Sequence, residues 1–228
     1  MTAGSERRAD LVRRLVRSGL YLVTDDRLAD DDLIARLQVA LEAGAEVVQF
    51  RDKRPERGRT YALGLRVAER CRARAALLLV NDFADLAVAL DADGVHVGQD
   101  DLPPRAARAV VGPDQVIGLS ASSVREAVEA EGGEADYLGF GALFPTATKL
   151  DTEPAGPTLL AEASRRVRLP IVGIGGVTVA NLDQVLHAGA DCVAVVSAVF
   201  SAPHPGQATR DLLAAIVKAR QLRMKNEE

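Results

Sequence analysis

The sequence predicts an α/β fold: a single (β/α)₈ TIM barrel over residues 1–228, with a short helical extension over residues 1–18 at its N-terminus. Eight short apolar runs, each followed by an amphipathic stretch and with no linker between them, predict this fold. Strict alternation of the two kinds of segment indicates a parallel sheet with right-handed crossovers. Eight repeats favour closure into a barrel over an open sheet. The length suits one well-buried core and is short for two domains.

Most of the predicted strands lack polar alternation, as expected for parallel strands that are covered on both faces. They are Leu20–Thr24, Ala45–Phe50, Ala76–Val80, Gly94–Val97, Val116–Leu119, Tyr137–Gly139, Pro170–Gly173 and Cys192–Val196. Apolar residues at helical spacing predict a helix over Arg7–Arg17 before the first strand. The helices predicted after the strands are Asp31–Glu42, Arg57–Arg74, Phe83–Leu90, Pro103–Val111, Ser123–Glu131, Gly156–Arg166, Val179–His187 and Gln207–Leu222.

Composition and charge exclude several classes of function. The net charge is −4 and no basic stripe is present, so we expect no nucleic-acid partner. No apolar run approaches the length of a membrane span, and residues 1–10 are polar, so we expect a cytoplasmic protein without a membrane partner. Cys71 and Cys192 show no spacing typical of a disulfide framework or metal site. The oligomeric state is left open.

Residues just after the predicted strands are the candidates for chemistry, because barrels of this kind place their active sites there. Gln49-Phe50-Arg51-Asp52-Lys53 stands at the end of the second strand. Alternation along the strand puts Gln49, Arg51 and Lys53 on one side, where two cations suit a polyanion such as pyrophosphate. A solvated loop with a surface ion pair is the alternative interpretation.

Two acidic sites follow the third and fourth strands, in Asn81-Asp82 and in Gly98-Gln99-Asp100-Asp101. Each aspartate could cap the helix that follows it. Together, however, neighbouring strands would offer two carboxylates at the same rim, and oxygen ligands of this kind suit Mg²⁺. By chemistry alone, Asp100 and Asp101 serve this purpose equally well.

The fifth and sixth predicted strands are also followed by polar groups. Ser120 either binds a substrate or caps the next helix. The segment 142–154 is the one long irregular stretch, and loops of this length in compact domains are often functional. Its Thr146, Thr148 and Lys149 place two hydroxyls and an ammonium within four residues, which resembles an anion clamp; a surface loop is the alternative.

The last two strands predict a phosphate site. Gly173-Ile174-Gly175-Gly176 follows the seventh strand and Val195-Val196-Ser197-Ala198 follows the eighth. Loops at these two positions form the recurring phosphate site of many barrels, through backbone N–H groups. For His96, His187 and His204 we expect packing or surface roles, and no Ser-His-Asp or Cys-His arrangement is apparent.

The chain resembles thiamin-phosphate synthases over nearly its whole length, from Tyr21-Leu22-Val23-Thr24-Asp25 to Val196-Ser197-Ala198. The motifs that carry the resemblance are QFRDK, NDF, GVHVGQDDL, GLSASS, GFGALFPTATK, GIGGV and VVSAV, in the expected order at the ends of the expected strands. The resemblance implies a transferase that condenses hydroxymethylpyrimidine pyrophosphate with a thiazole phosphate to give thiamin phosphate and pyrophosphate.

The resemblance also implies a role for each matching position. The pyrimidine pyrophosphate would contact Gln49, Phe50, Arg51, Asp52, Lys53, Asn81, Ser120 and Lys149, of which Arg51, Lys53 and Lys149 would be catalytic. The thiazole phosphate would contact Thr146, Ala147, Thr148, Gly176, Val196 and Ser197. Mg²⁺ would bind Asp82 and Asp101, the latter by family alignment. A thiazole tautomerase and a non-catalytic thiamin-phosphate-binding regulator are the alternative functions.

Overall fold

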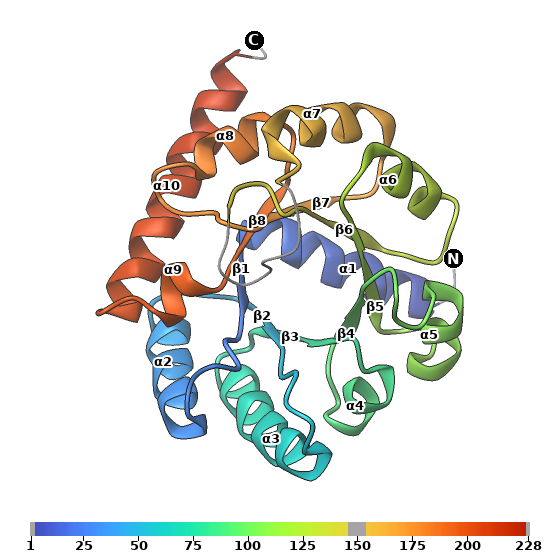
Figure 1. Cartoon of the computed structure of the whole chain (residues 1–228), viewed down its shortest axis with the longest axis vertical. Helices are drawn as coiled ribbons and strands as arrows, with labels where there is room; N and C mark the ends of the chain where they lie inside the picture. Colours follow the sequence, from blue (N-terminus) through green and yellow to red (C-terminus); the bar gives the residue numbers. More distant parts are fainter. Residues whose placement is uncertain (1–2, 146–153, 227–228) are drawn as a thin grey trace.

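The computed structural model of the chain describes residues 3–145 and 154–226 and shows a closed barrel of eight parallel strands in chain order (Figure 1). This confirms the predicted fold. The strands are β1 (Leu20–Val23), β2 (Val47–Phe50), β3 (Leu77–Asn81), β4 (Gly94–Val97), β5 (Val116–Ala121), β6 (Tyr137–Phe140), β7 (Ile171–Ile174) and β8 (Cys192–Val195). The barrel closes through β1 and β8, where Leu20 pairs with Val193 and Leu22 with Val195.

Helices surround the barrel and correspond closely to the predicted ones. They are α1 (Ala3–Ser18), α2 (Asp30–Glu42), α3 (Arg57–Ala73), α4 (Ala84–Ala89), α5 (Pro104–Val111), α6 (Val124–Glu131), α7 (Gly156–Arg166), α8 (Leu182–His187), α9 (Ser197–Phe200) and α10 (Pro205–Asn226). Two differences bear on the site. The short α9 was not predicted, and β5 extends two residues beyond the predicted end, so Ser120 lies within the strand.

Three aspartates connect neighbouring strands at the starts of β4, β6 and β8. Each directly precedes its strand and accepts the backbone N–H of a residue on the neighbouring odd-numbered strand. The pairs are Asp93 with Leu78 at 2.9 Å, Asp136 with Ile117 at 2.8 Å, and Asp191 with Ile171 at 2.9 Å. The repeated Ala-Asp before these strands therefore sets strand position, and leaves the opposite ends of the strands for chemistry.

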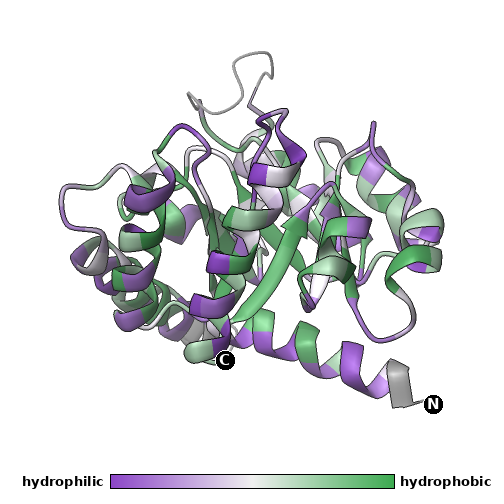
Figure 2. Cartoon of the chain, turned by 90° about the horizontal axis from the view of Figure 1, so that it is seen from below, coloured by the Kyte–Doolittle hydropathy of each residue, from purple (hydrophilic) through white to green (hydrophobic). Residues whose placement is uncertain are grey.

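The core has two parts. One lies between strands and helices, and the other fills the barrel interior, where Leu11 and Leu15 of α1 pack in the same cluster as Tyr21 and Tyr137. Figure 2 shows α1 running across one end of the barrel. Because this helix covers that end, the opposite end is left for the mouth. Within the described ranges, no helix has the length and hydropathy needed to cross a membrane.

Candidate functional site

A cavity of about 170 Å³ opens at the carboxyl ends of the strands. Residues from the ends of β2, β3 and β5 and from the loops after β7 and β8 meet in it. Seven of the predicted substrate-binding residues line this cavity: Gln49, Arg51, Asn81, Ser120, Gly176, Val196 and Ser197. Segments that are far apart in the sequence therefore converge on one site, as the strand order predicted.

Among the described residues, three that were predicted to bind substrate are not among those lining the cavity: Phe50, Asp52 and Lys53. Phe50 is 1% exposed and packs in the core between the barrel and its helices, near Gly64 of α3. Alternation along β2 explains this, because Phe50 faces away from the side taken by Gln49 and Arg51. Asp52 is also buried and forms an ion pair with Arg54. The predicted Thr146, Ala147, Thr148 and Lys149 lie outside the described residues.

The loops after β1 and β2 contain the same local motif, an aspartate that binds the arginine two residues later. Asp25 accepts hydrogen bonds from Nε and Nη2 of Arg27 at 2.8 and 2.7 Å, and Asp52 accepts the equivalent pair from Arg54 at 2.7 and 2.7 Å. The hydrogen bonds from Arg27 lower the pKa of Asp25. Burial opposes ionisation of Asp52, but the Arg54 contacts prevail and its pKa is also lowered. Both motifs therefore brace their loops as charged pairs.

Asp26 joins these two loops, a role that was not predicted from the sequence. Its Oδ2 accepts hydrogen bonds from Nη1 of Arg51 and from the backbone N–H of Lys53, both at 3.0 Å. Thr24 adds a second connection, because its hydroxyl donates to the Arg51 carbonyl at 2.9 Å and accepts from the Arg51 N–H at 2.8 Å. The spacing of Asp25 and Arg27 is repeated at residues 52 and 54. This repeat was the sequence signal that could have shown that the two loops have a related structure.

The Asp25 motif leads to a prediction about stability and pH. The pKa of Asp25 is lower in the folded protein than its ordinary value of 3.8, so the folded state favours the charged form. The stabilisation is fully present above that ordinary value and is lost as the pH falls through the lowered folded pKa. We therefore expect Asp25→Asn to lower the melting temperature at neutral pH, and the difference from the unsubstituted protein to shrink in strong acid.

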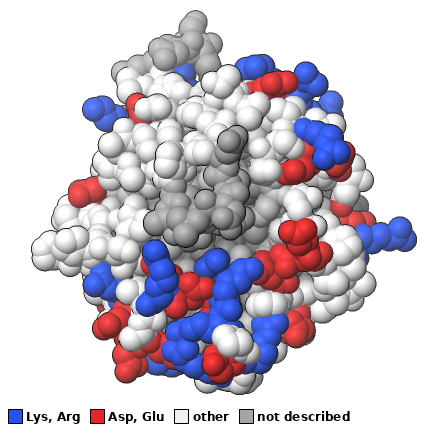
Figure 3. Space-filling model, in the orientation of Figure 1, with Lys and Arg blue, Asp and Glu red and all other residues white. Residues whose placement is uncertain are grey.

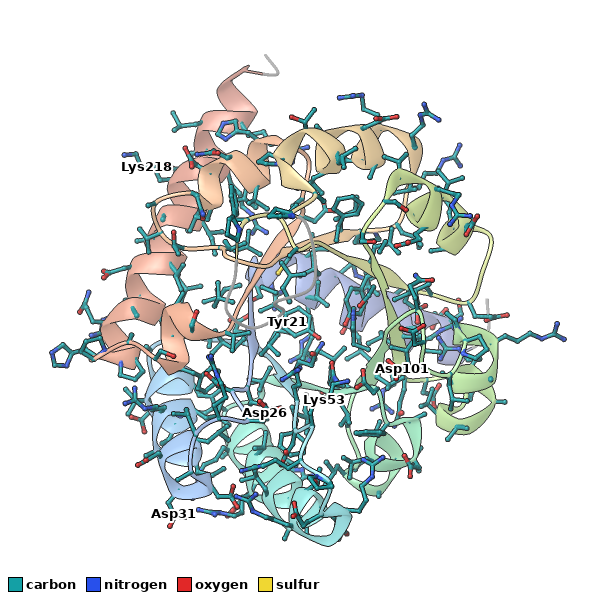
Figure 4. The ribbon with its side chains drawn as sticks, viewed as in Figure 1. Tyr21, Asp26, Asp31, Lys53, Asp101 and Lys218 are labelled. Atoms are coloured by element: carbon teal, nitrogen blue, oxygen red, sulfur yellow. The ribbon has the colours of Figure 1, made fainter. Side chains whose placement is uncertain are left out.

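Thermal unfolding across this pH range, followed by circular dichroism, measures the effect. Asp31→Asn is the matched control, because the Asp31 side chain is 91% exposed where it pairs with Arg66 and such pairs contribute little. Figure 4 places Asp31 at the periphery, far from the barrel centre. A melting-temperature difference for Asp25→Asn that stays constant with pH would contradict the assignment.

The ammonium of Lys53 donates to the carboxylate of Asp82, which joins the loop after β2 to the end of β3. The Asp82 side chain is 7% exposed, whereas that of Lys53 is about half exposed at 49%. Burial raises the pKa of Asp82, and the adjacent carboxylate of Asp101 raises it further, against the effect of Lys53. The two carboxylates therefore lie close enough to repel each other.

The local backbone positions both carboxylates. Asp82 has a φ of +64°, in the left-handed region that aspartate tolerates better than most residues. Asp101 accepts the backbone N–H of Gly98 at 2.8 Å. Neither residue caps a helix: Phe83 and Pro103 occupy the N-cap positions of α4 and α5, without side-chain capping bonds. The capping interpretation of the sequence is therefore wrong for both.

The paired carboxylates fit Mg²⁺. Two adjacent, mutually repelling carboxylates gain from a cation between them, and Mg²⁺ typically takes one or two protein carboxylates and fills its other positions with water and phosphate oxygens. Among the described residues there is no group of three or more His, Cys, Asp or Glu side chains placed to hold a metal, so a fully protein-made cage is not offered there. Asp101 contacts Asp82, whereas Asp100 is exposed.

Glycines shape the opposite wall of the cavity. Gly175 and Gly176 have φ values of +96° and +67°. A Cβ at Gly175 would lie 2.6 Å from Cα of Ala142, and one at Gly176 would lie 2.7 Å from Cβ of Phe144. The segment after β6 therefore packs directly on this loop, and only glycine fits. Asn181 braces the loop by donating to the Gly176 carbonyl at 3.0 Å.

Three side chains with rings also line the cavity without having been predicted: Tyr21, His96 and Tyr137. For His96 a packing or surface role was expected, yet its ring is 9% exposed and borders the cavity. These three residues were missed because they lie within apolar strands, where a side chain with a ring is expected to pack in the core. Figure 3 shows charged side chains gathered on the half of the mouth over α2 and α3, and Figure 4 shows Tyr21, Asp26, Lys53 and Asp101 toward the barrel centre.

The fold and site define a (β/α)₈ barrel with a mouth suited to phosphorylated ligands. The chain belongs to the thiamine monophosphate synthase family, whose model matches residues 20–199. It is 45% identical to a thiamine-phosphate synthase of Methanospirillum hungatei over 84% of this chain and 94% of that protein. It is 47% identical to the thiamine biosynthesis bifunctional protein ThiED of Geobacter sulfurreducens over 85% of this chain, but spans only 39% of that longer protein.

A solved structure supports the same family. The thiamine phosphate pyrophosphorylase from Pyrococcus furiosus superposes with a TM-score of 0.83 and is 37% identical, over 92% of this chain and 98% of that one. The structural similarity therefore extends over nearly the whole barrel.

Proposed function

We propose that this chain is a thiamin-phosphate synthase, a transferase that joins hydroxymethylpyrimidine pyrophosphate to a thiazole phosphate. One observation carries the proposal: Arg51 lines the cavity, and Asp26 holds it beside Lys53. The ammonium of Lys53 in turn contacts Asp82, next to the carboxylate of Asp101. Family membership supports the same reaction. The products are thiamin phosphate and pyrophosphate, and the family's small phosphorylated substrates suit a cavity that has Arg51 on one side and the Gly175-Gly176 loop on the other.

The reaction needs charge stabilisation more than proton transfer. The thiazole nitrogen supplies an electron pair to the pyrimidine CH₂ carbon, the bond from that carbon to the pyrophosphate oxygen breaks, and its electrons leave with the pyrophosphate. Arg51 and Lys53 would stabilise the negative charge that grows on the leaving group. The attacking nitrogen carries no proton to remove, so no general base is required. Mg²⁺ held by Asp82 and Asp101 would supply Lewis-acid stabilisation of the same leaving group.

The two substrates would bind on opposite walls of the cavity. Asp82 and Asp101 would hold Mg²⁺, with Gln49, Asn81 and Ser120 around the pyrimidine. The thiazole phosphate would bind on the opposite wall, at the backbone of Gly176, Val196 and Ser197, which lie in the same cavity. Two anionic substrates are thus kept at opposite sides of one cavity, with the reacting atoms between them.

The alternative functions require less than this site offers. A thiazole tautomerase, or a regulator that only binds thiamin phosphate, needs the phosphate site at the backbone of Gly176, Val196 and Ser197. Neither needs the cluster of Lys53, Asp82 and Asp101. We expect the enzyme to act in the cytoplasm, with two small phosphorylated substrates and no nucleic-acid or membrane partner. The free, buried thiols of Cys71 and Cys192 suit a reducing compartment.

Release of pyrophosphate from the two purified substrates tests the proposal. With Mg²⁺ and both substrates present we expect stoichiometric pyrophosphate and thiamin phosphate, and with EDTA we expect the activity to be lost. Conversion of the thiazole substrate alone, without pyrophosphate release, would favour the tautomerase. Tight binding of thiamin phosphate with no turnover would favour the regulator.

A further inference from the structure

A chain of five polar side chains runs along the barrel interior at the cavity, one from each of β1, β2, β4, β5 and β6. In order they are Gln49, Tyr21, Tyr137, His96 and Ser120, here called the polar chain. The contacting atoms are Gln49 Nε2 and Tyr21 Oη at 2.9 Å, the two tyrosine hydroxyls at 3.0 Å, Tyr137 Oη and His96 Nδ1 at 3.0 Å, and His96 Nε2 and Ser120 Oγ at 3.0 Å. All but Ser120 are at most 9% exposed.

The barrel is built around this chain. A Cβ at Gly118 of β5 would lie 2.3 Å from His96 Nδ1 and 2.2 Å from Cζ of Tyr137, and one at Gly139 of β6 would lie 2.8 Å from Cε1 of His96. Both strands therefore carry glycine where the two rings need space. Glycine weakens a strand interior, so its presence here favours a requirement for these rings.

The direction of the hydrogen bonds follows from counting protons. The Gln49 amide nitrogen donates to the Tyr21 hydroxyl. One direction then gives both tyrosine protons an acceptor within the polar chain: Tyr21 donates to Tyr137, and Tyr137 donates to Nδ1 of His96. His96 then carries its proton on Nε2 and donates to Ser120. Burial raises the pKa of both tyrosines well above the ordinary value, which keeps the two hydroxyls protonated and able to donate.

The two ends of the polar chain consequently have a fixed polarity at the cavity. Since one N–H of the Gln49 amide is engaged with Tyr21, the amide is held in one orientation, and its carbonyl oxygen is the acceptor that it offers to a ligand, beside its second N–H. Since Ser120 accepts from His96, its own proton is left for donation. A planar ring that carries an amino donor and a ring-nitrogen acceptor matches both ends, and an aminopyrimidine is such a ring.

We propose that Tyr21, Tyr137 and His96 are positioning residues that set this polarity and thereby select an amino-substituted pyrimidine over an oxo-substituted one. The inference deepens the proposed function and rests on it, since the pyrimidine is the ligand that the proposed function supplies. In an oxo-pyrimidine the exocyclic group accepts and the adjacent ring nitrogen donates, so the Gln49 carbonyl oxygen and the Ser120 proton would both lose the partners that the amino ring gives them, and unpaired buried groups are costly.

Binding of the two rings to Tyr137→Phe tests this selection. The substitution removes one hydroxyl from the middle of the polar chain and keeps the aromatic ring. Calorimetry with the amino- and oxo-pyrimidine pyrophosphates, without the thiazole, should give a preference for the amino ring of about a hundredfold in the unsubstituted protein, falling to about tenfold or less in the variant. Tyr61→Phe, on the exposed face of α3, is the matched control and should retain the full preference.

An equal loss of affinity for both rings in Tyr137→Phe would show a merely structural role and overturn the proposal. Failure of the unsubstituted protein to bind either pyrimidine would instead count against the proposed function. Nitrogen-15 NMR of the imidazole provides a test that needs no variant at Tyr137. Neutral His96 with its proton on Nε2 is expected, assigned by substitution of His187 and His204, and a proton on Nδ1 would overturn the direction of the polar chain.

Discussion

Asp82→Asn is expected to lower kcat/KM by about a thousandfold while the protein keeps its fold. Asp82 and Asp101 are adjacent carboxylates, and the loss of one charge removes half of the protein's contribution to the proposed Mg²⁺ site. The structure should tolerate asparagine, because the substitution removes the repulsion from Asp101 and leaves Lys53, which is about half exposed, able to reach water. Steady-state pyrophosphate release and thermal unfolding measure the two effects.

Asp100→Asn is the matched control for this experiment. Asp100 stands beside Asp101 in the sequence, yet it is exposed and Asp101 is the one that contacts Asp82. Its substitution should leave kcat/KM within about twofold, as for most surface changes. Similar losses in the two variants would mean that charge anywhere in this loop matters and that Asp82 and Asp101 are not a specific pair.

Lys53→Ala is expected to lower kcat by about a hundredfold, with a smaller effect on binding of the thiazole phosphate. The Lys53 ammonium contacts Asp82, and Asp26 holds the Lys53 backbone beside Arg51, so in the proposed site its charge should act on the leaving group. A group that stabilises only the transition state lowers kcat and kcat/KM together. Initial rates at saturating concentrations of one substrate, with the other varied, separate these parameters.

Lys218→Ala is the control for the loss of a lysine charge, because Lys218 is exposed on α10 and Figure 4 shows it at the edge of the molecule. It should leave kcat unchanged. A Lys53→Ala enzyme with undiminished kcat and a raised KM for the pyrimidine would assign Lys53 to ground-state binding and remove it from the chemistry.

The strand order and the rim residues could be predicted because they follow local rules. All strands of a parallel barrel point to the same end, so Arg51, Asp82 and Asp101 could be placed at that end once eight strands were recognised. Asp101 could not be preferred over Asp100 by such rules. That distinction depends on the turn in which Asp101 accepts the Gly98 N–H, which is a three-dimensional contact.

Other parts of the site depend on tertiary contacts that leave little trace in the sequence. Asp26 joins two loops, and His96 borders the cavity because Gly118 and Gly139 give its ring room on two other strands. Asp52 lies in a motif that was expected to bind substrate, but the arginine two residues later engages its side chain. Periodicity identifies the face of a strand, whereas these partners are set by the barrel's geometry.

Diffraction from crystals grown with Mn²⁺ and pyrophosphate tests the central claim most directly, since Mn²⁺ replaces Mg²⁺ at oxygen sites and gives an anomalous signal. The account predicts one metal peak in contact with the carboxylates of Asp82 and Asp101, with pyrophosphate oxygens completing its shell and Lys53 turned toward the pyrophosphate. Bound pyrophosphate with the metal held elsewhere, or held by Asp100 in place of Asp101, would contradict it.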